Sequence, residues 1–218
     1  MTDLHSHTLF SDGVLLPSEL ARRAIVKGYE ILALTDHVDH STIEIVIPAL
    51  VQAALAINRS MKIKIIPGCE ITHIDPSEIG ALAVECRKLG ARIIVVHGET
   101  LVEPVKKGTN RCALESDIDI LAHPGILSDE EAACAVSKGI AIEITSRAGH
   151  NLGNGLVTKL WYRYGFPLVV NSDSHAPGDL IDRSFASRVL SASGIADEDI
   201  ETVMKSSRAF AMERLCRD

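Results

Sequence analysis

Six of the nine histidines in this chain stand at, or just after, the end of a short apolar run. Glu70 has the same position after another such run. Imidazole and carboxylate side chains that successive strands deliver to one rim of a sheet can hold several metal ions together. We therefore interpret the chain as a metal-dependent hydrolase, with the candidate ligands His5, His7, Asp12, His37, Glu70, His97, His123, Asp173 and His175.

The spacing of these residues supports the interpretation. His5 and His7 are two residues apart in an extended run, so both side chains point to the same side and can bind one metal. A single strand histidine is more often a hydrogen-bonded core residue, but the whole ordered set makes coincidence implausible. All the candidate ligand atoms are nitrogen or oxygen, which suits Zn, Mn or Fe. We expect two or three such divalent ions per chain.

Glu70 is the natural carboxylate to bridge two of these ions. Its neighbour Cys69 would point to the opposite face of the strand, which excludes that thiol as a ligand. A bridged pair of ions lowers the pKa of a bound water and stabilises both oxygens of an in-line displacement.

The elements that must position these side chains are seven short apolar runs, at residues 3–7, 31–37, 63–70, 93–97, 118–123, 139–145 and 168–175. Near-continuous, β-branched runs of this kind are typical of parallel strands covered on both faces. Helical patterns fill the gaps, at residues 17–27, 42–59, 76–89, 128–139, 152–164 and 197–205. Pro48 inside the second pattern could kink or split that helix.

Strand and helix therefore alternate in an α/β chain, and two architectures compete. An open, doubly wound sheet gathers its site at one topological switch point. Here polar residues follow at least six strands, and only a closed ring brings so many strand ends together at its carboxyl-terminal rim. We predict a TIM-like barrel that is smaller than the eightfold one and distorted. No linker or repeat suggests a second domain, so residues 1–218 are expected to form one.

Composition narrows the choice of partners. The chain has 218 residues, a net charge of -7 and 46% hydrophobic but only 4% aromatic residues. An acidic surface argues against binding a long nucleic acid, although a local basic pocket for one phosphate remains possible. The five cysteines are scattered and suit a reducing compartment. We expect a cytoplasmic protein, since no leader and no segment of membrane-spanning length is evident.

The motifs resemble those of the PHP (polymerase and histidinol phosphatase) superfamily. The matching segments are Asp3–Thr8, Ser11–Gly13, Thr35–His37, Gly68–Glu70, His123–Pro124 and Ser172–His175. Segments 68–73, 97–100 and 143–150 further resemble its archaeal-type branch, labelled histidinol-phosphate phosphatase family. The resemblance implies a distorted (β/α)7 barrel with a trinuclear centre.

The resemblance also implies how the ligands are shared among three metals. The first metal would be held by His5, His7, Glu70 and Asp173. The second would be held by Glu70, His97 and His123. The third would be held by Asp12, His37 and His175.

Three further side chains are candidates for contact with a substrate. Arg147 follows the sixth predicted strand and could make a bidentate contact to a phosphoryl group. His150 in the same loop could protonate a leaving oxygen. Arg183 is a weaker phosphate candidate, since it could equally lie on a helix surface.

The leading hypothesis is therefore hydrolysis of a small phosphate ester, either a monoester or a short nucleotide diester. Amidohydrolase-type cleavage of a C–N bond is an alternative, because a bridged-metal hydroxide on a barrel rim serves that reaction too. A non-catalytic PHP structural module is a further alternative. The complete set of candidate ligands argues against the structural module.

Overall fold

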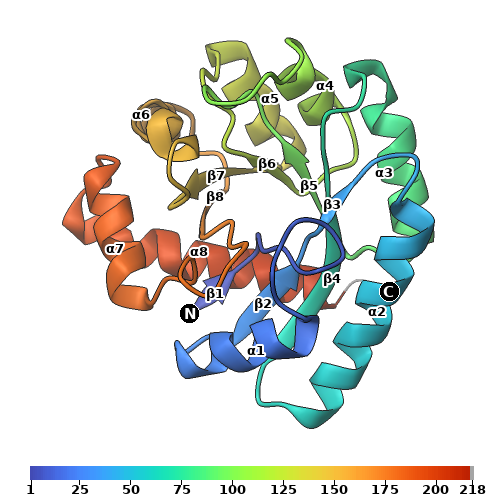
Figure 1. Ribbon diagram of the computed structural model, residues 1–218. Coiled ribbons are helices and arrows are strands. Elements are labelled where there is room, and N and C mark those ends of the chain that lie inside the picture. Colours follow the sequence, from blue (N-terminus) through green and yellow to red (C-terminus); the bar gives the residue numbers. More distant parts are fainter. Residues whose placement is uncertain (217–218) are drawn as a thin grey trace.

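Parallel strands form a nearly closed barrel in the computed structural model, which describes residues 1–216 (Figure 1). The order around the barrel is β1-β2-β4-β5-β6-β7-β8, and the short β3 pairs beside β4. The strands are β1 (Thr2–Asp3), β2 (Ile31–Leu34), β3 (His37–Val38), β4 (Lys64–Ile71), β5 (Ile93–His97), β6 (Ile120–Ala122), β7 (Ala141–Thr145) and β8 (Leu168–Asn171). The predicted distorted, TIM-like barrel of seven strands is confirmed.

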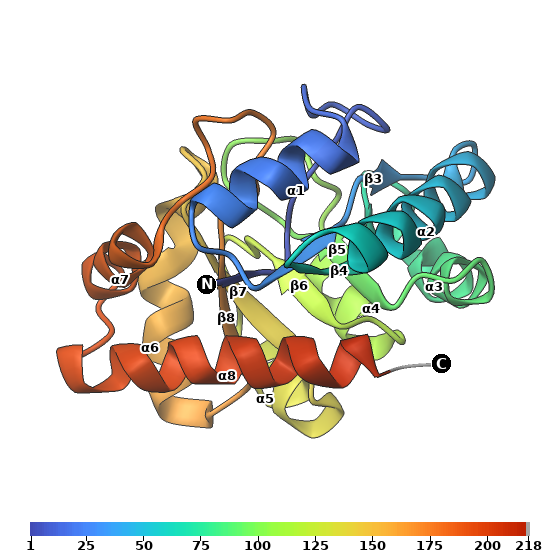
Figure 2. The ribbon, with the colours of Figure 1, turned by 90° about the horizontal axis from the view of Figure 1, so that it is seen from below.

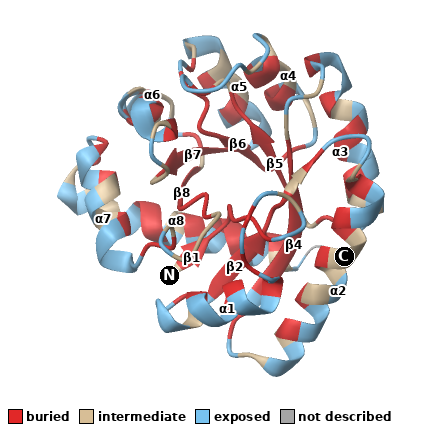
Figure 3. Cartoon of the chain, in the orientation of Figure 1, coloured by how far each residue is buried: buried red, intermediate tan, exposed pale blue. Residues whose placement is uncertain are grey.

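Helices surround this barrel, and their faces toward the strands are buried (Figure 3). They are α1 (Pro17–Val26), α2 (Ile43–Ser60), α3 (Ile79–Lys88), α4 (Thr109–Glu115), α5 (Asp129–Lys138), α6 (Asn154–Tyr164), α7 (Arg183–Ala192) and α8 (Asp197–Leu215), with short 3-10 turns η1 (Pro76–Glu78) and η2 (His150–Gly153).

The sequence patterns predicted six of these helices and missed α4 and α7. α4 is only two turns long, and α7 has a polar composition that hides its few buried positions. α8 continues to Leu215, well beyond the predicted end at Lys205. Pro48 lies inside α2 without ending it. Ser128 caps α5: its hydroxyl accepts the Glu131 N–H, and the Glu131 carboxylate accepts the Ser128 N–H.

Aliphatic side chains fill the inside of the barrel, as the low aromatic content predicts. Residues such as Leu4, Ile66, Ile93 and Val95 point inward and are almost completely buried. Phe210 and Ala211 of α8 also belong to this cluster, at the amino-terminal end of the barrel. Figure 2 shows α8 lying across the end of the barrel opposite to the strand-end loops. The amino-terminal end of the barrel is thus closed, and its other end is the one that carries polar side chains.

Side chains close the seam between β1 and β8. Only one backbone bridge, Ser6 to Ser174, joins the two segments. The Leu4 N–H donates to Oδ1 of Asn171 at 2.8 Å, and the Ser172 N–H donates to the buried carboxylate of Asp3. These bonds replace a regular ladder and account for the distortion of the barrel.

One helix among residues 1–216, α2, is long and apolar enough to cross a membrane by length and composition. The expectation that no segment reaches this length is therefore wrong. Val46, Ile47 and Leu50 are buried in the main hydrophobic core, and α2 packs on β4. The buried apolar side chains of α2 thus form part of the hydrophobic core between this helix and β4.

Candidate metal centre

The nine candidate ligands all lie at the carboxyl-terminal rim of the barrel. His5, His7 and Asp12 follow β1, and the other six lie in or directly after β3, β4, β5, β6 and β8. Carboxyl ends of parallel strands meet at one rim, so residues far apart in the sequence come together. Four groups of side chains have ligand atoms within 4.8 Å of one another, and together they include all nine candidates and His150. The predicted convergence is what the structure shows.

Glu70 lies at the middle of the centre and is completely buried. Its Oε2 is 3.2 Å from Nε2 of His5, 3.5 Å from Nε2 of His7 and 2.9 Å from Nδ1 of His37. Its Oε1 faces Nε2 of His123 at 3.5 Å. The two carboxylate oxygens therefore face different histidines, which is the arrangement that a bridging carboxylate needs.

Two more carboxylates extend the cluster on either side. Asp173 Oδ1 is 3.2 Å from Nε2 of His7, and its Oδ2 is 3.8 Å from Nε2 of His123. Asp12, which is half-exposed, lies 3.2 Å from Nε2 of His175 and 3.6 Å from Nε2 of His37. Spacings of this size are those of neighbouring ligands on a common ion with bonds of about 2.0–2.2 Å.

Several of these buried atoms have no hydrogen-bond partner in the part of the chain that the structure describes. They include both ring nitrogens of His7, Nε2 of His5, both oxygens of Glu70 and Oδ1 of Asp173. Buried polar atoms are normally paired, because an unpaired one costs the full penalty of leaving water. The unpaired atoms point at one another across a shared space, so the donor set fits divalent metal ions.

Other residues hold the rings in place. Glu143 in β7, which is completely buried, receives a hydrogen bond from Nδ1 of His5 at 2.8 Å and another from the Asn171 side chain. Nδ1 of His97 donates to the Gly98 carbonyl at 3.2 Å. Each bond fixes one ring nitrogen as the donor and leaves Nε2 free for a metal. Glu143 was not among the predicted site residues, because it reads as part of an apolar strand.

Asp36 lies directly before His37 and contacts the loop after β1. Its carboxylate accepts the Thr8 N–H at 2.7 Å and the Ser11 hydroxyl at 2.9 Å. It therefore fixes the loop that carries Asp12.

Within the described part of the chain, the non-glycine residues with strained backbone all lie at this rim. Among residues 1–216 the non-glycine residues with positive φ are His73 (55°), His123 (27°) and Asp173 (52°). This region is costly for any residue with a Cβ, and it persists where function or packing demands it. Two of the three residues are candidate ligands.

Burial and the charges of neighbouring groups often shift the pKa of a residue in this cluster in opposite directions. Burial lowers the pKa of His5, but Glu70, Glu143 and Asp173 outweigh it and raise that pKa well above its usual range. Burial favours the neutral acid at Glu70, yet His5 and His37 hold its pKa well below the usual range. Burial, followed by the proximity of His37, lowers the pKa of His7. The rings and carboxylates thus compete for protons in the space that the unpaired atoms enclose.

Glu103 is a residue that the sequence analysis missed. It lies in the loop between β5 and α4, and its Oε2 is 3.0 Å from Nε2 of His97. Its Oε1 is 3.3 Å from Nε2 of His150. Glu103 follows no apolar run, so the strand-end pattern that marks the other acids is absent there.

His150 is buried beside the candidate ligands, with its ring centroid 4.5 Å from that of His123. Burial and the nearby His123 lower its pKa to about 4. Its predicted role as a proton donor stays a prediction, and its position makes it equally available as a ligand.

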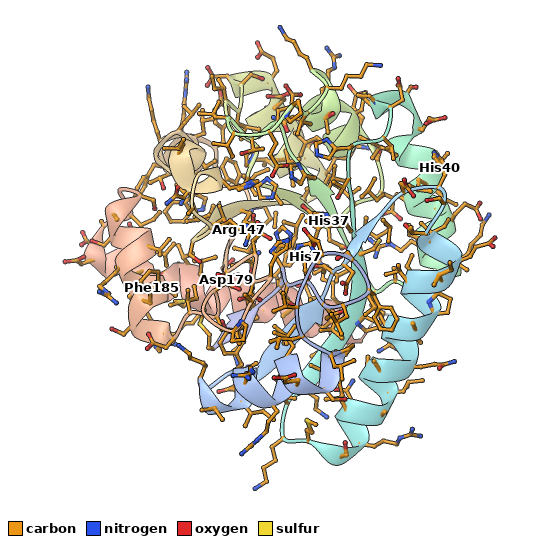
Figure 4. The ribbon with its side chains drawn as sticks, in the orientation of Figure 1. His7, His37, His40, Arg147, Asp179 and Phe185 are labelled. Carbon is orange, nitrogen blue, oxygen red and sulfur yellow. The ribbon has the colours of Figure 1, made fainter. Side chains whose placement is uncertain are left out.

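The two candidate arginines have different surroundings. Nε of Arg147 is 3.7 Å from Oδ2 of Asp173, and its side chain lines a cavity of about 480 Å³ together with His150 and Phe185. Figure 4 shows Arg147 on the side of the centre toward Asp179 and Phe185. Arg183 does not line this cavity, and its guanidinium forms an ion pair with Glu201 of α8. The structure thus brings Arg147, but not Arg183, to the metal centre.

Comparison with known proteins gives the chain a family. Residues 3–149 match the PHP domain family. An uncharacterised protein of Methanocaldococcus jannaschii is 43% identical over 204 residues, which cover 93% of this chain and 94% of that protein. A probable phosphatase of Syntrophotalea carbinolica is 27% identical over 91% of this chain and 90% of its own length. The 5'-3' exoribonuclease Rnm of Escherichia coli is 30% identical over 64% of this chain and 44% of its own length.

Solved structures share the fold. A chain in a structure of archaeal ribonuclease P with mature tRNA has a TM-score of 0.75 at 18% identity, covering 100% of this chain and 94% of that one. A putative histidinol phosphatase from Listeria monocytogenes has a TM-score of 0.62 at 13% identity, covering 86% and 99%. At such low identity these structures show the same architecture and nothing about a shared substrate.

Proposed function

The chain belongs to the PHP domain family and is a metal-dependent phosphoesterase, and from this premise we propose that it hydrolyses a small phosphate ester at the rim that carries Glu70. The observation that supports this most is the cluster of unpaired buried ligand atoms beside a cavity lined by Arg147. Divalent ions bound there would activate water and stabilise charge on a phosphoryl group.

The chain's own residues divide the work in this proposal. Glu70 would be shared by two metal ions, and Glu143 holds the His5 ring so that its Nε2 would be available to one of them. Arg147 extends from the loop after β7 and would bind a non-bridging oxygen of the substrate. Its present contacts, to the Asp173 carbonyl and carboxylate and to the Asp179 carboxylate, measure 3.4–3.7 Å, which is long for tight hydrogen bonds and ion pairs. The guanidinium is therefore available to an anion.

The cavity favours a nucleotide-sized substrate. Phe185, which is 42% exposed, lines the cavity that Arg147 enters, and Phe10, which is 40% exposed, lines a second cavity of about 590 Å³ on the other side of the centre. Exposed aromatic rings beside a phosphate site can stack on nucleobases. Similarity to an exoribonuclease and to a probable phosphatase is compatible with a mononucleotide or a short oligonucleotide. A net charge of -7 disfavours a long duplex.

Arg147→Ala distinguishes this proposal from hydrolysis of a C–N bond. We expect kcat/KM for phosphate esters to fall by about 10²-fold, the usual effect of losing one preorganised charged donor. Metal content should not change, because arginine is not a ligand. The measurement is a panel of phosphomonoesters, short diesters and amides, assayed with metal-reconstituted protein and after treatment with a chelator.

The outcomes separate the alternatives. Inorganic phosphate should inhibit the wild type more strongly than the variant. Equal activity and equal phosphate inhibition in both proteins would remove Arg147 from the site. Turnover of amides alone would favour the amidohydrolase alternative. A metal-loaded protein inactive on every ester and amide would favour the structural module.

A further inference from the structure

Glu103 faces the metal centre from a loop that supplies none of the nine candidate ligands. Its carboxylate lies 3.0 Å from Nε2 of His97 and 3.3 Å from Nε2 of His150. Nε2 of His73, on the loop after β4, lies 3.5 Å from the same carboxylate. One acid thus gathers three imidazoles from three different strand-end loops.

Hydrogen bonds inside the loop show that this placement is built. The Glu99 carboxylate accepts the N–H groups of Gly108 and Asn110, and the Asn110 side chain bonds the Glu99 N–H and the Pro124 carbonyl. The two ends of the loop are thereby tied to each other and to the loop after β6. Lys106 adds an ion pair to Asp75.

Glycines let the neighbouring loops approach Glu103's loop closely. Gly125 has a φ of +62°, and a Cβ there would lie 2.1 Å from the Glu99 carbonyl oxygen. Gly149 has a φ of +84°, and a Cβ there would meet the Val102 side chain at 3.2 Å. A Cβ at Gly125 would clash with backbone, and the positive φ at both positions favours glycine, so the loops after β6 and β7 pack closely on the segment that carries Glu103.

The hydrogen bonds of His97 show what its contact with Glu103 requires. Because Nδ1 donates to the Gly98 carbonyl, Nε2 of the neutral ring carries a lone pair. That lone pair faces a carboxylate oxygen at 3.0 Å, and two acceptors at this distance repel each other unless a cation or a proton lies between them. Nδ1 of His150, a residue only 8% exposed, also has no partner among residues 1–216.

We propose that Glu103 is a metal ligand, and that with His97 and His150 it binds an ion that His123 also contacts. The groups His97–His123–His150 and His73–His97–Glu103 have ligand atoms within 4.8 Å of one another, and His97 belongs to both. Metal binding would then add to the hydrogen bonds and glycine contacts that already hold the loop after β5 against the barrel. The inference rests on the metal dependence in the proposed function, whichever ester is the substrate.

Glu103→Gln tests the proposal, because it removes a charged ligand while keeping the size of the side chain. Glu78→Gln is the matched control: Glu78 is a half-exposed acid whose Oε2 lies 3.3 Å from Nε2 of His40, away from the centre. Figure 4 shows His40 at the edge of the molecule, apart from His7 and His37. Both variants lose one carboxylate from a histidine–glutamate pair.

The measurement is metal bound per chain during titration with a chelator, using reconstituted protein without substrate. Glu103→Gln should release one ion at a chelator concentration about 10- to 100-fold lower than the wild type does. Glu78→Gln should follow the wild-type curve. Glu103→Asp, which keeps the charge on a shorter side chain, should recover part of the affinity. Circular dichroism of each variant checks that it is folded.

Two results would overturn the proposal. If Glu103→Gln keeps every ion with the wild-type profile, Glu103 is not a ligand; if it does so and also loses turnover, Glu103 acts on the substrate instead. A wild-type chain that binds no metal would overturn the metal-dependent function itself, and this inference with it. The metal readout therefore distinguishes the failure of the ligand from the failure of the function.

Discussion

Buried charge occurs at both ends of the barrel, and it is arranged in opposite ways. At the amino-terminal end, Asp119 is only 1% exposed, and its carboxylate accepts hydrogen bonds from Arg87, from Arg214 and from the Ile94 N–H at 2.6, 3.1 and 2.8 Å. At the carboxyl-terminal end, both oxygens of the buried Glu70 have no hydrogen-bond partner among the described residues.

This difference distinguishes a structural network from a binding site. The cluster around Asp119 satisfies its own charges, which is how a buried acid helps to join α3, β5 and α8. The cluster around Glu70 leaves its atoms directed into a common space and keeps strained backbone at His123 and Asp173. The first network is complete within the protein, whereas the second becomes complete only with a ligand.

The sharpest test of this contrast is Glu70→Gln. Losing the central carboxylate should reduce kcat/KM by more than about 10³-fold, because in the proposed centre two metal ions would share this ligand and stabilise charge on the substrate. Steady-state kinetics and elemental analysis measure the effect. If the variant keeps wild-type activity and full metal content, the cluster around Glu70 is not the catalytic centre.

Asp119→Asn tests the cluster around Asp119 in the same way. We expect the free energy of unfolding to fall by about 3 kcal/mol, because the variant removes the buried anion shared by Arg87 and Arg214 and leaves them the exposed Asp117 and Glu213 as charged partners. Activity per folded molecule should stay at the wild-type level, since Asp119 lies at the opposite end from Glu70. Chemical denaturation together with active-site titration checks both parts. A specific loss of turnover would mean that the two ends are coupled.

Asp3 lies between the two regions, at the seam, and predicts a pH dependence of stability. Burial raises the pKa of its carboxyl to about 6, so the folded chain binds the proton more tightly than the unfolded chain, whose pKa is near 3.9. This contribution is present below pH 4 and is lost as the pH rises to 6. It amounts to about 2–3 kcal/mol.

Asp3→Asn should abolish this part of the pH dependence. The measurement is the difference in unfolding free energy between wild type and variant at several pH values from 4 to 7. Groups that titrate in both proteins cancel in that difference. A difference that does not change with pH would mean that Asp3 is already ionised at pH 4.

The sequence predicted the parts of the molecule that repeat a pattern. Strands such as β5 are short, apolar and end in a polar residue, His97, so both the barrel and its rim of ligands could be predicted. The seven apolar runs predicted the number of strands, and the resemblance to PHP motifs implied the same (β/α)7 barrel. These features are local, and a few neighbouring residues specify each of them.

The missed features depend on contacts between distant segments. Glu103 meets His97 and His150 only because loops far apart in sequence pack through Gly125 and Gly149. Glu143 is an acid in an apolar strand, and its role depends on His5 lying across the barrel. α8 extends to Leu215 because the open base of the barrel needs a cover, which its own weakly amphipathic sequence does not reveal.

Arg183→Ala should have the smallest effect, and it is the control for Arg147→Ala. Arg147 follows β7 and Arg183 follows the loop after β8, and the sequence predicts both as phosphate contacts. In the structure Arg183 is 57% exposed on its side chain and pairs with Glu201, whereas Arg147 is 31% exposed and lies beside Asp173. An exposed ion pair stabilises a protein by about 0–1 kcal/mol, so the melting temperature should change little. Since its guanidinium points to α8 and not into the cavity at the rim, kcat/KM should stay within about twofold of wild type, the range expected of a surface change. A loss approaching that of Arg147→Ala would show that Arg183 leaves Glu201 when substrate binds. Arg183 would then contact the substrate, although it lies outside the cavity in this structure.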